Sequence, residues 1–219
     1  MDQADLAFLR GGYARLGHFG SCTLRFFLQH LEDVSDRFFD SVWKEVAADY
    51  NWPLDPLHEW SRVWEYPFVA AQLAQATSPR SDARLLDVGS AVTFFTFYLL
   101  AVGFKVTNLD CDPRMPLVFQ RAYKLAAPGM ALTDFPVYLV NDARKIELVS
   151  ESMDAIVCLS VLEHIREYDQ VVFEFARLLR PGGFLLLTFD IDATGENGLS
   201  IAELERLLGL LTRIMHDYV

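Results

Sequence analysis

The chain is poor in cysteine, lacks a long apolar run and contains no dense cluster of basic residues, and each shortage excludes a class of protein. Its 3 cysteines in 219 residues have the spacing of neither a disulfide framework nor a zinc site. No uninterrupted apolar run reaches the roughly 18 residues that span a bilayer. The acidic start of the sequence lacks the order of a signal peptide. We therefore expect a cytoplasmic protein with reduced thiols.

Acidic residues outnumber basic ones, which limits the partners that the chain attracts. Together, 30 Asp and Glu against 19 Lys and Arg give a formal net charge of −11. Because neutralisation of phosphates supplies most non-specific binding, this charge argues against nucleic acid and against a membrane surface. The 5 histidines are scattered, so no metal site is expected. A small-molecule substrate or a protein partner is the prediction.

The hydrophobic pattern divides the chain into two parts. Residues 1–80 place apolar side chains at helical spacing and show no convincing strand. From residue 81 onward, short runs that are apolar on both faces alternate with helical stretches, as in a parallel sheet covered by helices. We predict a helical N-terminal lid or substrate region over 1–80. A doubly wound, mainly parallel, Rossmann-like α/β domain is predicted over 81–219.

The second part predicts individual strands and helices. Strands are expected at 84–88, 105–109, 137–140, 154–159 and 184–189, and helices at 93–102, 114–126 and 169–179. The residues after 190 predict one amphipathic helix and leave no room for the last strands of a full doubly wound sheet. This shortness predicts an exposed sheet edge, which a homodimer or a partner chain would cover.

The stretch "LLDVGSAVTFFTFYLL" at 85–100 joins a strand to an aromatic helix through a turn with a single glycine. In open α/β sheets, ligands bind beyond the carboxyl ends of the strands, and Gly89 lets the backbone approach a ligand closely. Asp110 ends the next strand at about the spacing at which a carboxylate holds ribose hydroxyls. A nicotinamide-dependent oxidoreductase is a weaker alternative, because the turn lacks the spaced glycines that bring a helix N-terminus onto a pyrophosphate.

Four segments in register resemble the class I S-adenosylmethionine-dependent methyltransferases. They are residues 85–113, "VNDARKI" at 140–146, "MDAIVCLSVLEHI" at 153–165 and "FARLLRPGGFLLLT" at 175–188. The resemblance implies S-adenosylmethionine as cofactor and S-adenosylhomocysteine as product. It further implies methyl transfer to a nitrogen, oxygen or carbon of a small molecule, mainly by in-line positioning.

The resemblance also assigns the cofactor-binding positions. They are Asp87, Gly89, Ser90 and Ala91 at the methionine end, Asp110 at the ribose, Cys111, Asp142 and Ala143 at the adenine, and Ser160 below the sulfonium. Each polar position has a structural alternative, because a carboxylate that follows a strand also caps turns and loop amides.

Catalytic and substrate-binding candidates lie outside these positions. His164, with Glu163 and Tyr13 behind it, is the candidate general base for an acceptor that enters protonated. The aromatic residues Trp60, Trp64 and Tyr66 are the candidate substrate wall of a lid. Packing in a helical core is the alternative for these rings.

The turn departs from the family pattern at Ala91, where the resemblance implies glycine. If the backbone there has a positive φ, the Cβ costs on the order of 1 kcal/mol and weakens cofactor binding ~10-fold. If φ is ordinary, the cost is almost nil. This departure, together with the short C-terminus, keeps a second hypothesis open. The chain would then be a degenerate, non-catalytic methyltransferase-like subunit that acts through a protein partner.

Overall fold

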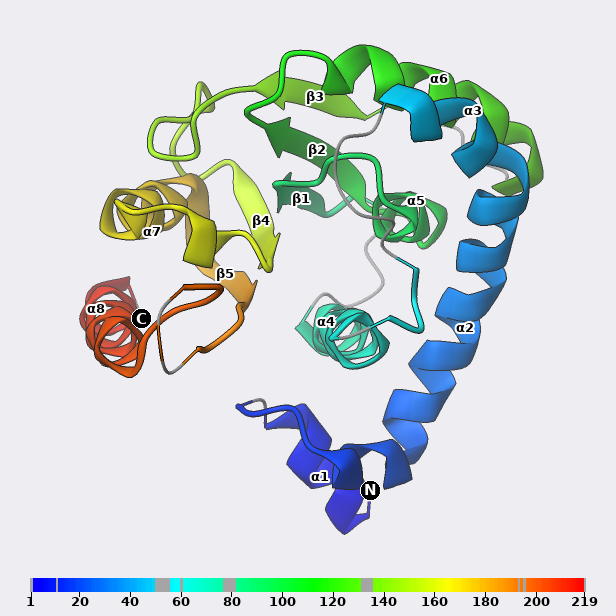
Figure 1. The fold of residues 1–219 in the computed structure, drawn as a ribbon. Coiled ribbons are helices and arrows are strands. Elements are labelled where there is room, and N and C mark those ends of the chain that lie inside the picture. Colours follow the sequence, from blue (N-terminus) through cyan, green and yellow to red (C-terminus); the bar gives the residue numbers. More distant parts are fainter. Residues whose placement is uncertain are drawn as a thin grey trace. The chain divides into compact units, whose positions relative to one another are not determined.

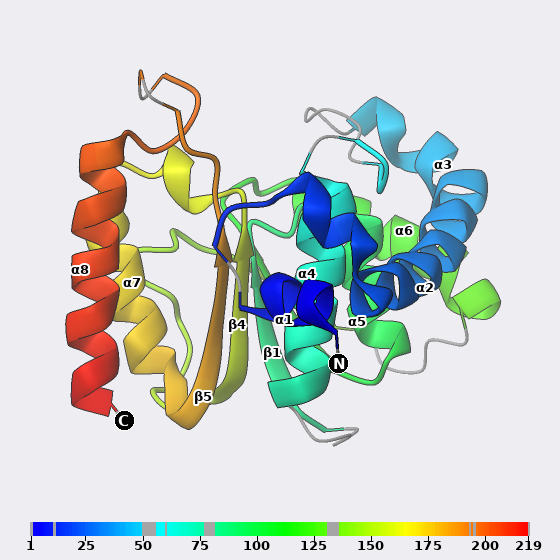
Figure 2. The same cartoon turned by 90° about the horizontal axis from the view of Figure 1, so that it is seen from below.

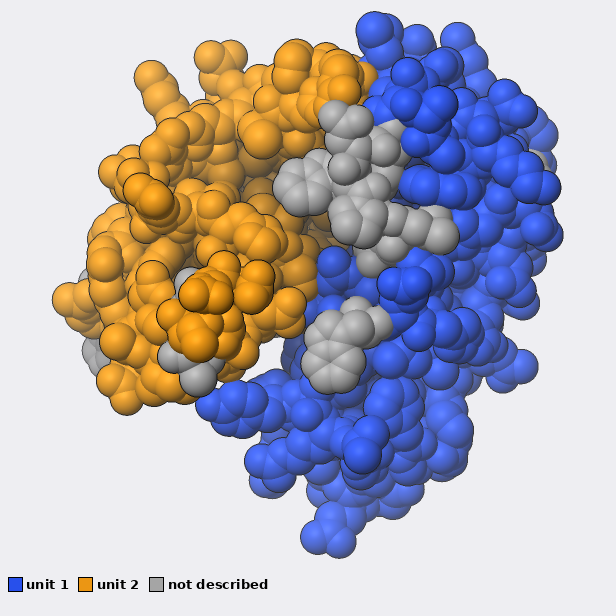
Figure 3. All heavy atoms as spheres, in the orientation of Figure 1, with its two compact units in different colours: residues 1–82, 92–104, 117–135 blue, residues 83–91, 105–116, 136–219 orange. Residues whose placement is uncertain are grey.

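Two compact units make up the chain in its computed structural model (Figure 3). The structure describes residues 2–10, 12–49, 56–59, 61–76, 82–130, 136–192, 194 and 196–218. Unit 1 contains residues 1–82, 92–104 and 117–135, and unit 2 contains residues 83–91, 105–116 and 136–219. All of the sheet belongs to unit 2. The division of function at residue 80 stays a prediction.

Unit 2 is built on a five-stranded sheet in which neighbouring strands run parallel (Figure 1). The strands are β1 (Arg84–Val88), β2 (Lys105–Asp110), β3 (Val137–Val140), β4 (Met153–Leu159) and β5 (Leu179–Thr188), in the order β3-β2-β1-β4-β5. Because β1 pairs with both β2 and β4, the chain reverses its direction of winding there. The switch point of the sheet therefore lies at the carboxyl end of β1. The predicted α/β fold class is confirmed.

β5 begins at Leu179, earlier than predicted. Leu179 already pairs with Met153, and the register with β4 then shifts before Phe184 pairs with Ala155. Gly182 lies in the intervening bulge with a φ of +73°, a conformation that glycine adopts without steric cost. The apolar run starts only at Phe184, so the hydrophobic pattern reveals the second part of the strand and not the first.

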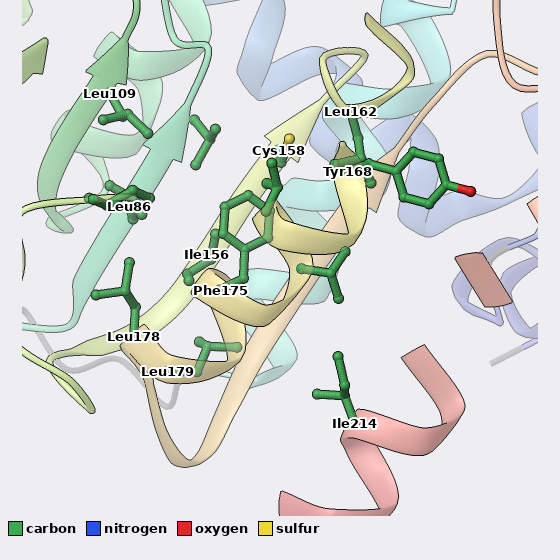
Figure 4. Close-up of a cluster of buried hydrophobic side chains, with 14 of the residues drawn as sticks. Leu86, Leu109, Ile156, Cys158, Leu162, Tyr168, Phe175, Leu178, Leu179 and Ile214 are labelled. Atoms are coloured by element: carbon green, nitrogen blue, oxygen red, sulfur yellow. The ribbon is translucent and has the colours of Figure 1, made fainter. Parts of the chain in front are cut away.

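One face of the sheet packs against two helices of the same unit, α7 (Tyr168–Leu178) and α8 (Ile201–Tyr218) (Figure 2). Successive side chains of a strand point to opposite faces of the sheet. Leu86 of β1 and Cys158 of β4 are among those that point into the core on this face. There they join Phe175 of α7 and Ile214 of α8 (Figure 4). Burial raises the pKa of the Cys158 thiol, which keeps it protonated and unreactive.

Unit 1 is helical. It contains α1 (Gln3–Leu9), α2 (Cys22–Phe38), α3 (Lys44–Val46), α4 (Arg62–Ala76), α5 (Phe94–Ala101) and most of α6 (Met115–Met130). Asp5 ties α1 to the start of α2, because its carboxylate accepts hydrogen bonds from Ser21 Oγ at 2.6 Å and from the Thr23 N–H at 2.9 Å. No helix in the described ranges is long and apolar enough to cross a membrane.

His18 and Trp64 form a buried polar contact inside this helical unit. The Trp64 indole N–H donates a hydrogen bond to His18 Nδ1 at 2.8 Å, and the His18 side chain is only 5% exposed. Burial lowers the pKa of His18, and the nearby Arg15 adds to the effect. The contact requires an unprotonated Nδ1, so the folded unit favours neutral histidine.

We expect His18 to make the protein less stable in acid. Because its pKa is lowered on folding, its contribution to stability is complete above the ordinary histidine pKa of about 6.5 and is lost as the pH falls below it. His18→Asn offers an amide oxygen that does not titrate. Urea denaturation at pH 7.5 and pH 5.5 should show a smaller acid loss in His18→Asn than in the wild type. An equal loss in both would remove His18 as the cause.

Candidate functional site

The turn after β1 is fixed to the end of β2. The N–H groups of Gly89 and Ser90 both donate to the carbonyl oxygen of Leu109, at 2.8 and 3.3 Å. Gly89 has a φ of +68°, and a Cβ at this position would lie 2.4 Å from Cγ2 of Val161. Glycine is therefore required here by the backbone conformation and by close packing against the loop that follows β4.

Ala91 adopts the left-handed conformation that the sequence analysis left open. Its φ is +42°, and the residue is only 7% exposed. The Ala91 N–H donates to Oδ2 of Asp110 at 3.1 Å, while its carbonyl oxygen accepts a hydrogen bond from the Tyr138 hydroxyl at 2.9 Å. The condition for a strained turn is thus met, and both backbone polar groups of the strained residue have partners.

Asp110 is the buried carboxylate at the centre of this arrangement. Its side chain lies at the end of β2, where Oδ1 accepts the Asp112 N–H at 2.9 Å and Oδ2 accepts the Ala91 N–H. A carboxylate has about four acceptor sites, so two protein hydrogen bonds leave capacity for hydroxyl groups of a ligand. Position, burial and remaining capacity all suit the predicted ribose contact.

Two further polar side chains lie buried at the end of β1 and in the turn that follows it. Asp87 is the penultimate residue of β1, and Ser90 follows Gly89. Ser90 Oγ has no hydrogen-bond partner among the residues that the structure describes. Leaving a buried hydroxyl unsatisfied costs about 1–3 kcal/mol, and a polar group of a ligand would remove that cost. The turn therefore fits a ligand that carries polar groups at the end that lies beside Ser90.

Asp142, the candidate adenine contact, lies after β3 and is partly occupied by an ion pair. Arg144 donates from Nε and Nη2 to both of its carboxylate oxygens, and Nη1 of the same guanidinium reaches Glu167 at 2.9 Å. The hydrogen bonds from Arg144 lower the pKa of Asp142, so this carboxylate stays charged. Ala143 packs against the core of unit 2. Cys111 is exposed next to Asp110.

The loop after β4 carries Ser160 and two of the catalytic candidates. Ser160 has a φ of +50°, and its N–H donates to the carbonyl oxygen of Thr188 at the end of β5. Glu163 Oε1 accepts the Asp190 N–H at 3.1 Å, which joins this loop to the one after β5. His164 ends a short 3-10 helix (Leu162–His164) and is exposed. Glu163 therefore has a structural role, and His164 is accessible.

The aromatic candidates of unit 1 differ from one another in their environments. Trp64 packs in the core with Phe8 and Phe68, while Tyr66 is stacked on Phe95 with ring centroids 4.5 Å apart. Both rings are buried, as the alternative of packing in a helical core predicts. Their role as a substrate wall stays a prediction. Tyr13 is 61% exposed. Trp60 lies outside the described residues.

Tyr138, in β3, is the polar residue bound to the turn that sequence reasoning missed. Its signal was its place in β3, where it is in register with Asn108 of β2 and thus shares a face of the sheet with Asp110. A tyrosine in a strand is ordinary, so this signal is weak without the strand order. In the described part of the chain, no group of three or more His, Cys, Asp or Glu side chains could hold a metal ion.

Comparison with known proteins relates this chain to a family. A family model described as a methyltransferase domain matches residues 86–187. A ubiquinone biosynthesis O-methyltransferase of Xanthomonas oryzae pv. oryzae is 30% identical over 193 residues, which cover 85% of this chain and 76% of that protein. A second such enzyme, from Xanthomonas campestris pv. campestris, is also 30% identical and is covered to 76%.

Solved structures share the fold at lower identity. A phosphoethanolamine N-methyltransferase 2 of Haemonchus contortus, in complex with S-adenosylhomocysteine, is 18% identical with a TM-score of 0.53. The match covers 66% of this chain and 35% of that one. The PH0226 protein of Pyrococcus horikoshii OT3 is 20% identical with a TM-score of 0.50, over 65% and 77% of the two chains.

The packing of Gly89 gives a prediction about stability. A methyl group at this position meets the branched side chain of Val161 and requires an unfavourable φ, so Gly89→Ala should lower the free energy of unfolding by about 2–4 kcal/mol. The combined variant Gly89→Ala with Val161→Ala removes the clash and keeps the backbone strain. It should recover stability relative to Gly89→Ala alone in thermal denaturation. A fully stable Gly89→Ala protein would contradict the geometry of the turn.

Proposed function

Since the chain belongs to the class I S-adenosylmethionine-dependent methyltransferases, we propose that it transfers a methyl group from this cofactor to an oxygen of a small-molecule acceptor. The chain is an enzyme, and S-adenosylmethionine is its cofactor. Oxygen is favoured over nitrogen and carbon because the relatives that share 30% identity are named O-methyltransferases. The identity of the acceptor is left open by this argument.

One observation carries the assignment of the cofactor site. Asp110 ends β2 beside the switch point of the sheet and hydrogen-bonds the backbone of the turn that follows β1. A carboxylate in this place is suited to ribose hydroxyls. Ser90 would serve a polar group at the methionine end, and Asp142 would serve the adenine. The hydrogen bonds of this turn come from the protein itself, which lowers the cost of ordering the site.

The chain's contribution to the reaction is positioning. The cofactor supplies a methyl group that its sulfonium already activates, so little chemical assistance is needed from the protein. Gly89, Ser90 and Ala91 fix the course of the backbone at one end of the site, and the hydrogen bond from Asp190 to Glu163 fixes the loop after β4. These contacts would hold the cofactor in line with the acceptor and exclude water.

His164 would remove the proton from a hydroxyl acceptor. Its side chain is exposed on the short helix after β4, whereas Glu163 is already engaged by the Asp190 N–H. A neutral imidazole carries one ring nitrogen that can accept a proton. Tyr13 belongs to unit 1, and its role as an alternative base stays a prediction.

Binding of the cofactor to Asp110→Ala tests the proposed site. In calorimetric titration, S-adenosylmethionine and S-adenosylhomocysteine should bind the wild type with micromolar affinity. Asp110→Ala should weaken both by about 10–100-fold, because a hydrogen bond to a charged group contributes about 1.5–3 kcal/mol. Asp154→Asn is the control, since Asp154 lies at the opposite end of β4 and pairs with Arg84 and Arg180. Unchanged affinity in Asp110→Ala would exclude the ribose contact.

The same titration separates the enzyme from the non-catalytic alternative. A subunit that acts only through a partner would bind neither ligand, and it would use an edge of the sheet, where β3 or β5 lacks a neighbour within the described residues. Size-exclusion chromatography with light scattering then reveals whether a second copy covers that edge. Cofactor binding by a monomer would favour the enzyme without a partner.

The role of His164 gives a kinetic prediction. His164→Ala should reduce kcat on small hydroxylated acceptors about 100-fold or more, since general-base catalysis contributes roughly 10²–10⁴-fold. Its affinity for S-adenosylmethionine should change little, because the residue lies outside the cofactor turn. Release of S-adenosylhomocysteine across a pH series measures the effect. His30→Ala removes another exposed histidine, on α2, and as the control it should keep the wild-type kcat. Full turnover in His164→Ala would remove the assigned base.

A further inference from the structure

The strained residue of the cofactor turn is held from two strands at once. Asp110, at the end of β2, accepts the Ala91 N–H at 3.1 Å, and Tyr138, in β3, donates its hydroxyl proton to the Ala91 carbonyl oxygen at 2.9 Å. All three residues belong to unit 2. The peptide groups on either side of the Ala91 Cα are thus both fixed by side chains that come from other parts of the sheet.

The conformation of Ala91 explains why such fixing matters. An L-residue at a φ of +42° carries a Cβ in a region that glycine enters freely and alanine does not. Alanine also has no polar side chain with which to stabilise this conformation locally, as asparagine or aspartate would. Strained backbone persists only where surrounding contacts enforce it. The two hydrogen bonds are contacts of that kind.

The strand register brings the Tyr138 hydroxyl to the turn. Tyr138 lies beside Asn108 of β2, and β1 is the next strand beyond. Neighbouring strands are about 4.8 Å apart, so a ring directed across β2 covers most of the distance. The turn covers the rest, because the N–H groups of Gly89 and Ser90 bend it toward the carbonyl of Leu109 in β2.

We propose that Tyr138 is a positioning residue of the cofactor site, which holds Ala91 in the left-handed conformation and so replaces the freedom of a missing glycine. This proposal rests on the proposed function in that the turn after β1 is the site of the cofactor. Tyr138 acts through Ala91 and does not itself touch the reacting atoms. Its importance depends on the residue at position 91: a glycine there needs the hydroxyl less than alanine does.

A double-mutant cycle measures this dependence. Calorimetric titration with S-adenosylhomocysteine is performed on the wild type, Tyr138→Phe, Ala91→Gly and the double variant. Tyr138→Phe should weaken binding about five- to tenfold, the equivalent of roughly one net hydrogen bond. The same change made in the Ala91→Gly protein should weaken binding less than about twofold. At saturating S-adenosylmethionine, the kcat of Tyr138→Phe should stay within about twofold of the wild-type kcat.

Tyr168→Phe is the matched control. Tyr168 also donates its hydroxyl to a backbone carbonyl, that of Glu203, at 3.3 Å, and it lies in unit 2 away from the turn. This variant should leave the affinity for S-adenosylhomocysteine unchanged. Thermal denaturation of both tyrosine variants shows whether the fold survives. A comparable loss of affinity in Tyr168→Phe would assign the effect to general destabilisation and would overturn the proposal.

Amide exchange in the cofactor-free protein gives a readout that does not depend on binding. Loss of the Tyr138 hydroxyl should speed exchange of the Ala91 amide about fivefold, the equivalent of roughly one net hydrogen bond, whereas the Leu186 amide in β5 should be unaffected. If the wild type binds no cofactor, the proposed function fails, and the exchange rates still decide whether Tyr138 holds the turn. Unchanged exchange at Ala91, or equal losses of affinity with alanine and with glycine at position 91, would overturn the proposal.

Discussion

The hydrogen bonds that fix the turn after β1 to the end of β2 are the constraint on which the site depends. The carbonyl oxygen of Leu109 accepts hydrogen bonds from two successive N–H groups of the turn, and the carboxylate of Asp110 accepts one from the next N–H group. These hydrogen bonds have two effects. They terminate β1 at the switch point of the sheet, and they fix the carboxylate of Asp110 at the carboxyl ends of the strands, where open α/β sheets bind ligands. A change at the end of β2 therefore affects fold and ligand site together.

Among the described residues, two of the four non-glycine residues with a positive φ lie at the carboxyl ends of central strands, and the other two, Ser61 and Glu151, lie elsewhere. Positive φ values are found at Gly89 and Ala91 after β1, and at Ser160 after β4. Each of these residues also takes part in a hydrogen bond to, or a close contact with, a neighbouring strand or loop. Strain of this kind costs of order 1–3 kcal/mol for a non-glycine residue and persists where the surroundings over-determine it. Its position beside the switch point is what a prearranged ligand site requires.

The sequence predicted β1, β2 and β4 well because each is a short apolar run that is mostly buried. β3 also lies where it was predicted, although Val137 and Val140 at its two ends are exposed. The sequence predicted the start of β5 poorly, since Leu179 precedes a bulge that interrupts the apolar run. For the site, strand-end residues such as Asp110 could be named from spacing alone. The φ of Ala91 and the reach of Tyr138 could not, because both depend on the order β3-β2-β1, which no local pattern encodes. Trp64 was ambiguous because its role also depends on a contact that is not local: its hydrogen-bond partner His18 is distant in sequence.

Ala91, at a position where the family resemblance implies glycine, has a different meaning once its surroundings are known. Taken alone, an alanine at positive φ suggests a turn that has lost its function. In the structure, however, both backbone groups of Ala91 are hydrogen-bonded by the protein, and the buried carboxylate that fixes the turn is retained at Asp110. These two hydrogen bonds stabilise a backbone conformation that alanine does not adopt freely. An alanine at this position, held by two hydrogen bonds from the protein, therefore argues for an ordered turn rather than for a turn that has lost its structure.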